Sequence, residues 1–308
     1  MNMSKSMELT ILLGVLASFA GALGWWRWRG KAGASQQERG EALKTCRLLL
    51  GLLKLIQQHR GLASGWLAGD GAFLGRMAER RREVDQLLPR LVQAVAQEEG
   101  HARPCVTTQG FKLFRFRWRE VVEGLPQASV EQSIAQHSML VGELLEWLSA
   151  LGEARIELAQ DTDLPQGLVR NFAHRLPALS EYLGQARAIG SSVAARKGCS
   201  PVARVRLMFL IARAEALLTQ ALERGGSLGL GHPAAEGARR AVAEMAQVVR
   251  SQMLMSAGVT VSSDDFFRIA TAAIDGVFAW VDACAQELER CLAVPPAPSH
   301  RRLATGPA

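Results

Sequence analysis

The alternation of apolar and polar positions divides the chain into one apolar run near the N-terminus and a long series of segments with helical periodicity. Residues 9–26 contain no charged side chain. At 1.5 Å per residue this run spans roughly 27 Å, about the thickness of the hydrocarbon core of a bilayer. The pattern predicts one transmembrane helix over about 9–26, within a membrane anchor formed by residues 1–31.

The charges on either side of this run predict its orientation. Lys5 is the only basic residue before it, whereas Arg27, Arg29 and Lys31 follow it closely. By the positive-inside rule we expect a single-pass protein of the inner (cytoplasmic) membrane, with the bulk of the chain in the cytoplasm. A signal peptide cleaved near the small residues 20–22 is the alternative, and it would export the remainder.

After a short linker, apolar positions recur every three or four residues, which is typical of amphipathic helices. Ser129 and Gln132 form a capping-box pattern, Ser200 precedes Pro201 as a helix start, and Pro177 is expected to kink the helix that contains it. Eight helices are predicted, over about 36–67, 72–98, 108–124, 129–158, 165–197, 201–224, 234–256 and 262–293.

Four predicted helices lie on each side of a break rich in Asp and Pro at residues 161–165. Four antiparallel helices suffice to close a bundle around one core. We therefore predict an all-α fold in which the transmembrane helix is followed by two linked four-helix bundles, over residues 36–158 and 163–293. The basic, Pro-containing tail at 294–308 is expected to be disordered.

Composition excludes several classes of protein. A net charge of +7 is compatible with nucleic-acid binding, but basic residues alternate with acidic ones, as at residues 79–83. The aromatic and basic helix 108–124 has the phase of a helix buried on one side. We therefore expect no nucleic-acid partner.

Candidate catalytic and metal-binding groups are scattered. The five cysteines and six histidines form no cluster at ligand spacing, and the odd number of cysteines suits a reducing compartment. The sequence contains no P-loop, no nucleophile elbow and no HExxH motif. It predicts that the protein is not an enzyme and has neither a metal nor a cofactor.

An internal repeat provides the strongest functional signal. When the sequence is aligned with itself at an offset of 127 residues, Arg60 coincides with Arg187 and Ser64 coincides with Ser191. Gln57, Arg60 and Ser64 share one helix face. Glycine and serine weaken a helix, so their repeated use around an arginine indicates a site. The rigid guanidinium fork suits a small oxyanion, and we predict a site formed by Arg60, Arg187, Ser64, Ser191 and Gln57. Exposed ion pairs are the alternative explanation for the arginines.

Three segments resemble those of the nitrate- and nitrite-sensing (NIT) domain of bacterial receptors and antiterminators. They are Leu-Ile-Gln-Gln-His-Arg-Gly-Leu-Ala-Ser at 55–64, Leu-Gly-Gln-Ala-Arg-Ala-Ile-Gly-Ser at 183–191, and the stretch 265–275 that begins Asp-Phe-Phe and ends Ala-Thr-Ala-Ala-Ile-Asp. The resemblance covers about residues 45–290. It implies two linked four-helix bundles, nitrate or nitrite bound by arginines on the motif helices, and a ligand-driven shift relayed to an output domain.

Two positions depart from the family pattern, since His59 stands where an acidic residue is common and Ala188 where glycine is usual. Only residues 294–308 follow the last predicted helix, so we expect the output to lie in a signalling partner or a homodimer. Two hypotheses follow. The first is a membrane-anchored nitrate or nitrite sensor; the alternative is a non-catalytic helical adaptor or scaffold with a vestigial anion site.

Overall fold

The computed structural model describes residues 36–158, 164–165, 167–255 and 258–293. These residues form eight long helices joined by short loops, with no strand among them, so the all-α prediction is confirmed. The predicted transmembrane helix and the predicted C-terminal tail lie outside the described residues. Within those residues, no helix combines the length and apolar character that crossing a bilayer requires.

The first half of the chain begins its helices where the local signals predict. Thr107 caps α3 by accepting a hydrogen bond from the backbone N–H of Gly110, and Ser129 and Gln132 form the predicted capping box of α4. The elements are the first helix (residues 36–67), α2 (Phe73–Glu98), α3 (Thr108–Gly124), α4 (Val130–Leu151) and a π-helical extension of α4 (Gly152–Glu157).

The second half contains a π-helical stretch beside its proline. Pro177 has no N–H to bond the carbonyl of Ala173, and the predicted interruption takes the form of π winding directly before it. Ser200 caps α7 as predicted. The elements are α5 (Leu168–Arg170), which continues through the π segment Asn171–Arg175 into α6 (Leu176–Ala195), then α7 (Pro201–Glu223), α8 (Pro233–Val248) with a second π segment (Val249–Met253), and α9 (Ser263–Ala293).

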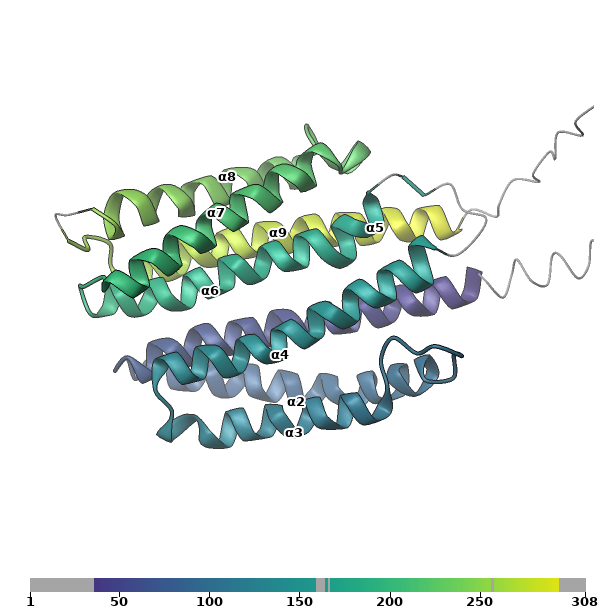
Figure 1. Ribbon diagram of the computed structural model, residues 1–308, viewed down its shortest axis with the longest axis horizontal. Helices are drawn as coiled ribbons and strands as arrows, with labels where there is room; N and C mark the ends of the chain where they lie inside the picture. The colour runs from purple at the N-terminus through teal and green to yellow at the C-terminus, as the bar shows by residue number, and fades with distance from the viewer. Residues whose placement is uncertain (1–35, 159–163, 166, 256–257, 294–308) are drawn as a thin grey trace, which may run out of the picture.

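The eight helices form a central group of four flanked by two outer pairs (Figure 1). The first helix, α4, α6 and α9 lie in the middle, with α2 and α3 on one side and α7 and α8 on the other. The first helix runs beside α9, since Lys54 pairs with Asp275 at 3.0 Å and the side chain of Gln36 donates to the carbonyl of Leu292. The first and last described helices therefore meet at one end of the molecule.

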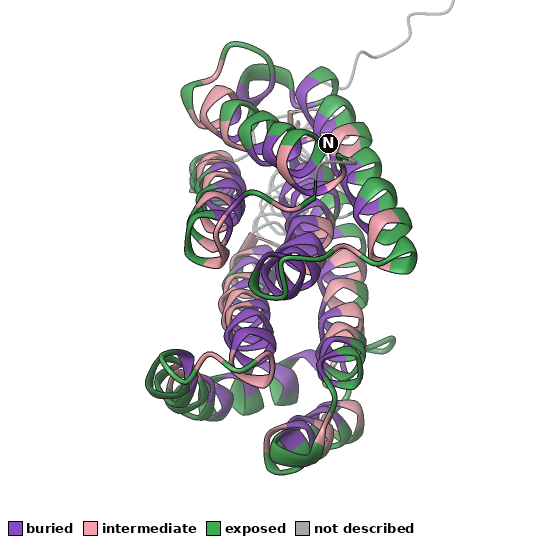
Figure 2. Cartoon of the chain, turned by 90° about the vertical axis from the view of Figure 1, so that its left-hand side faces the viewer, coloured by how far each residue is buried: buried purple, intermediate pink, exposed green. Residues whose placement is uncertain are grey.

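Buried residues concentrate in the central helices (Figure 2). One cluster of buried apolar side chains extends through both halves. Almost every residue of α6 is buried, because this helix packs against α7, α9 and the first helix. Polar residues on α6 and in the matching part of the first helix are therefore inside the protein.

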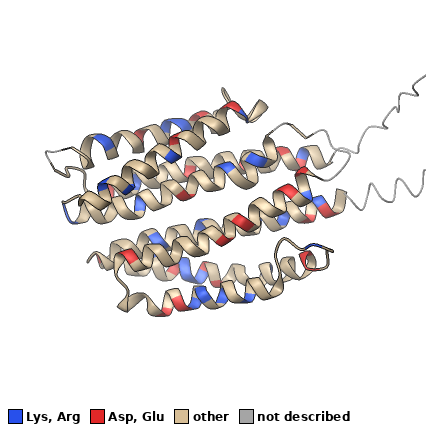
Figure 3. Ribbon diagram, in the orientation of Figure 1, with Lys and Arg blue, Asp and Glu red and all other residues tan. Residues whose placement is uncertain are grey.

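Charged residues of both signs alternate along the outer surface (Figure 3). Several form ion pairs between neighbouring helices, such as Arg117 with Glu143 at 3.1 Å and Arg250 with Glu215 at 2.5 Å. These exposed pairs contribute little to stability. They differ sharply from the charged groups in the centre of the molecule.

Candidate functional site between the two halves

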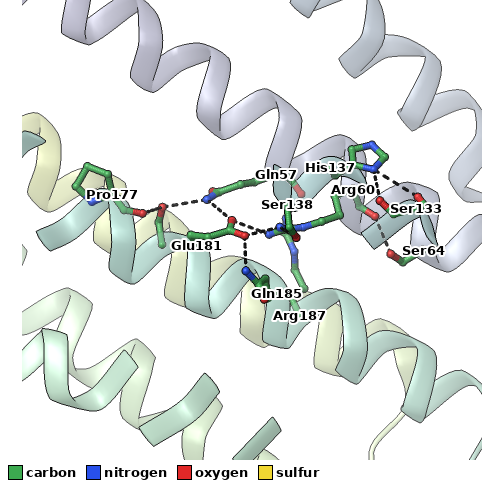
Figure 4. Close-up of polar contacts among 11 residues, drawn as sticks. Gln57, Arg60, Ser64, Ser133, His137, Ser138, Pro177, Glu181, Gln185 and Arg187 are labelled. Carbon is green, nitrogen blue, oxygen red and sulfur yellow. Dashed lines mark hydrogen bonds and ion pairs between the residues drawn. The ribbon is translucent and has the colours of Figure 1, made fainter. Parts of the chain in front are cut away.

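Arg60 of the first helix is fully buried and reaches into the second half of the protein. Its Nη1 and Nη2 atoms donate to the two carboxylate oxygens of Glu181 on α6, at 2.6 and 2.9 Å. Nη1 also donates to Ser138 Oγ on α4 at 2.8 Å. The carboxylate partner of Arg60 is thus buried, unlike the exposed partner that the ion-pair alternative expected (Figure 4).

Arg187 of α6 is also buried and reaches in the opposite direction. Its Nη2 donates to the backbone carbonyl of Gln57 at 2.9 Å, and its Nη1 donates to Thr271 Oγ1 on α9 at 3.0 Å. The guanidinium carbon lies 5.1 Å from the centroid of the Phe267 ring. Burial, assisted by the charge of Arg60, lowers the pKa of Arg187 to about 10, so the side chain remains charged at neutral pH.

The repeat in the sequence corresponds to a repeat in the contacts. Each arginine donates to a hydroxyl on the last long helix of its own half, Ser138 on α4 or Thr271 on α9. Each also donates to an acceptor in the other half. The two acceptors differ in charge, because Arg60 meets a carboxylate whereas Arg187 meets a neutral carbonyl.

Two motif glycines permit these crossings. A Cβ atom on Gly184 would lie 2.6 Å from Nη2 of Arg60, and one on Gly61 would lie 3.1 Å from Nε of Arg187. Each guanidinium therefore lies against a glycine of the opposite motif helix. This close approach accounts for glycines that weaken the helices in which they stand.

The other three predicted site residues are buried, but they have different surroundings. Gln57 Nε2 donates to Glu181 Oε2 at 3.1 Å, which places this amide beside the ion pair. Ser64 Oγ donates to the carbonyl of Arg60 at 2.8 Å, so its hydrogen is already bonded within its own helix. Ser191 Oγ has no hydrogen-bond partner among the described residues.

Four buried polar atoms at this junction lack partners among the described residues: Nε of Arg60, Nε of Arg187, Oγ of Ser191 and Oε1 of Gln57. An unpaired buried polar group costs about 1–3 kcal/mol, and such groups are rare in native proteins. Three of the four can donate a hydrogen bond. Their common requirement is an acceptor.

The buried charges at the junction do not balance. Arg60 pairs with one carboxylate, Glu181, whereas Arg187 contacts no carboxylate among the described residues, and Lys54 and Asp275 neutralise each other in a half-exposed pair. Next to Arg60, His59 and His137 form a buried hydrogen bond of 2.8 Å between their rings. Burial lowers the pKa of His59 to about 4 and that of His137 well below its usual value, so both are neutral at pH 7. One positive charge remains uncompensated.

A cavity of about 240 Å³ reaches Arg187 from the surface. Phe267, Thr271, Glu79 and two arginines of α2, Arg76 and Arg80, also line it. Arg80 pairs with Glu79 at 3.2 Å, so Arg76 and Arg187 supply the attraction for anions. Arg60 does not line this cavity and lies deeper, between α4 and α6.

A larger cavity, of about 470 Å³, lies elsewhere, where the starts of α4 and α7 approach Arg196. None of the unpartnered polar atoms lines it. Volume alone therefore does not identify the site, and the buried, unpaired Nε of Arg187, a residue that lines the smaller cavity, is the stronger indication.

Sequence reasoning missed four residues of this junction: Glu181, Ser138, Thr271 and Phe267. Thr271 and Phe267 lie within the third segment of the family resemblance, at 265–275, so this resemblance was a signal that could have identified them. Glu181 stands six residues before Arg187 on α6, and Ser138 had no signal at all. In the described part of the chain, no three His, Cys, Asp or Glu side chains gather as a metal ion requires.

Comparisons with known proteins agree on the class of the fold and of the domain. A family profile described as nitrate and nitrite sensing (NIT) matches residues 52–289. The solved structure of the NasR transcription antiterminator is similar, with a TM-score of 0.57 and 17% sequence identity over 92% of this chain and 76% of that chain. At this identity the likeness concerns the fold. No match was found among curated protein sequences.

Proposed function

Because this chain belongs to the family of nitrate- and nitrite-sensing (NIT) domains, we propose that Arg60 and Arg187 together bind one nitrate or nitrite ion. The observation that carries this proposal is the uncompensated charge between the halves. Of the two buried guanidinium groups only that of Arg60 pairs with a carboxylate among the described residues, and each has an Nε–H without an acceptor there. A small monovalent oxyanion supplies both the missing charge and the missing acceptors.

Binding takes place between two helices that belong to different halves. The ion accepts one hydrogen bond from Nε of Arg60 on the first helix. It accepts two more from α6, from Nε of Arg187 and from the hydroxyl of Ser191. Gln57 and Ser64 hold the turn of the first helix on which Arg60 stands. The ligand therefore stabilises one arrangement of the first helix against α6, and this arrangement is the signal.

The direct test is a thermal unfolding titration of the full chain in detergent with nitrate and nitrite. A ligand present at one hundred times its Kd stabilises the folded state by roughly 2.7 kcal/mol. At about 2.1 cal/mol/K of unfolding entropy per residue, we expect the Tm of this 308-residue chain to rise by roughly 4 °C. Chloride at equal ionic strength should leave the Tm unchanged.

Variants connect the shift to the arginines. Arg60→Lys and Arg187→Lys keep the positive charge but lose the planar fork, so both should abolish the nitrate shift while the protein remains folded. Arg175→Lys is the matched control, since Arg175 is a buried arginine of the same helical run whose Nη1 donates to Asn171 Oδ1 at 2.9 Å, outside the proposed site. A full nitrate shift in both site variants would refute the proposal.

We propose in addition that the protein is anchored in the inner membrane by residues 9–26, with residues 36–293 in the cytoplasm. The uncharged run and the basic residues that follow it support this proposal. Membrane fractionation and labelling of an engineered cysteine from each side provide the test. Recovery of the chain in the periplasmic fraction would contradict it.

The second candidate function is that of a helical adaptor, and one observation favours it. Val202, Val205, Met208 and Phe209 are each more than half exposed on α7, which is an unusual density of apolar side chains on one surface. An adaptor would retain its protein partner equally with or without nitrate, and in the Arg60→Lys variant. For the sensor, we expect capture of a signalling partner, or self-association, to depend on nitrate.

A further inference from the structure

Among the residues that the structure describes, Glu181 is the only carboxylate that contacts a buried arginine of this site, and it belongs to neither arginine motif. We propose that Glu181 sets the charge of the ligand, so that the site accepts monovalent oxyanions and rejects divalent ones. This inference rests on the proposed function, because it concerns the same anion site.

Four hydrogen bonds hold the carboxylate of Glu181 in place. Oε1 accepts hydrogen bonds from Arg60 Nη1 at 2.6 Å and Gln185 Nε2 at 2.7 Å. Oε2 accepts from Arg60 Nη2 at 2.9 Å and Gln57 Nε2 at 3.1 Å. Four donors, two of them from the guanidinium of Arg60, therefore fix the position of this carboxylate in the site.

The consequence is a preference based on charge. The pair of guanidinium groups contributes two positive charges, and Glu181 removes one of them. A monovalent anion neutralises the remaining charge. A divalent anion would instead leave one negative charge buried without a partner, which is strongly unfavourable in a water-poor interior.

Glu181→Gln is the matching perturbation. The amide oxygen can still accept from Arg60, and either neighbouring glutamine can turn its own amide to suit the new side chain. The charge is lost, together with one of the two hydrogen bonds from Arg60, because the amide NH2 cannot accept. The repulsion between the Glu181 carboxylate and the ligand is proportional to the charge of the ligand. Removing it should therefore raise the logarithm of the affinity twice as much for a divalent anion as for a monovalent anion.

Perchlorate and sulfate make this comparison at constant shape, since both are tetrahedral and differ by one charge. We expect wild-type protein to bind nitrate and perchlorate in preference to sulfate. In Glu181→Gln the ratio of sulfate affinity to perchlorate affinity should rise by about tenfold or more. Calorimetric titration of the full chain in detergent, at fixed ionic strength and millimolar anion, measures all three ligands.

Glu98→Gln provides a matched control. Glu98 is a buried carboxylate that also pairs with an arginine, since Arg155 Nη2 donates to it at 2.7 Å, but it lies on α2 away from the junction. It should leave the anion preference unchanged. Glu181→Asp keeps the charge, so the preference for monovalent anions should persist even where the overall affinity falls.

The outcomes separate this proposal from the one on which it rests. Nitrate binding to wild type with an unchanged sulfate-to-perchlorate ratio in Glu181→Gln overturns the role of Glu181 and leaves the arginine site standing. Comparable binding of sulfate and perchlorate by wild type overturns it without any variant. Absence of nitrate binding to wild type overturns both proposals.

Discussion

Gly184→Ala tests the geometry of the site with a single methyl group. Gly184 stands on α6, and the added Cβ would lie 2.6 Å from Nη2 of Arg60, whereas ordinary contacts are 3.4–4 Å. The guanidinium must therefore retreat by about 1 Å. Glu181 lies one turn before Gly184 on the same face of α6, so this movement also separates Arg60 from its carboxylate.

The size of the effect follows from these contacts. A retreat of that size stretches hydrogen bonds of 2.6 and 2.9 Å to the limit of hydrogen bonding. Overpacking of a buried position costs about 1–3 kcal/mol, while replacing a helical glycine by alanine contributes up to about 1 kcal/mol in favour of folding. We expect Gly184→Ala to lower the free energy of unfolding by about 1–2 kcal/mol and to weaken nitrate binding at least about tenfold.

Gly142→Ala on α4 is the control, because nothing lies within 4 Å of its added Cβ. Helix propensity alone should then stabilise the protein, by about 0.5–1 kcal/mol. Urea unfolding followed by circular dichroism compares the two variants, and calorimetry with nitrate compares their binding. Equal stabilisation by both substitutions, with nitrate affinity unaffected, would show that Arg60 does not lie against Gly184.

Three further predictions concern the interior. The pKa of His59 is about 4 in the folded state and near 6.5 in the unfolded state, so the unfolded state binds more protons between these pH values. The free energy of unfolding should therefore fall by up to about 3 kcal/mol as the pH drops from about 6.5 toward 4. Urea titrations at several pH values should show a weaker pH dependence for His59→Gln. Trp280→Phe removes the indole N–H that donates to the Leu228 carbonyl at 2.7 Å, and thermal melts should register a loss of about 1–3 kcal/mol. Burial raises the pKa of Cys46 to about 12, so iodoacetamide at pH 8 should modify this thiol only after urea unfolds the chain, as peptide mass mapping can establish.

The helices were largely predictable because their signals are local. Apolar periodicity predicted a helix over about 108–124, where α3 lies, and the capping box of Ser129 opens α4 as expected. The π segments were not predictable from such signals. One π segment begins at Gly152, where an added Cβ would lie 2.4 Å from the Cβ of Ala173. The π winding there coincides with a close contact between parts of the chain that are distant in sequence.

The site was predictable only in part, for a related reason. The repeat identified Arg60 and Arg187, because glycine and serine beside a helical arginine are costly for folding. The counter-charge was hidden, since nothing in one sequence says which of many glutamates faces Arg60 across the junction. Ser64 shows the reverse limitation, because a serine in a helix can bond the carbonyl four residues earlier, and here it does so.

At the proposed site, the crossing of the two arginines couples the affinity for the ion to the way in which the two halves dock. Arg60 contacts Glu181 of the second half, and Arg187 contacts the Gln57 carbonyl of the first. A partner protein that prefers one docking angle of the halves changes the affinity of this chain for the ion by some factor. By thermodynamic reciprocity, the ion changes the affinity of this chain for that partner by the same factor. In the proposed sensor, a receiver of the signal therefore also sets the anion concentration at which the response occurs, and that threshold belongs to the complex rather than to this chain alone.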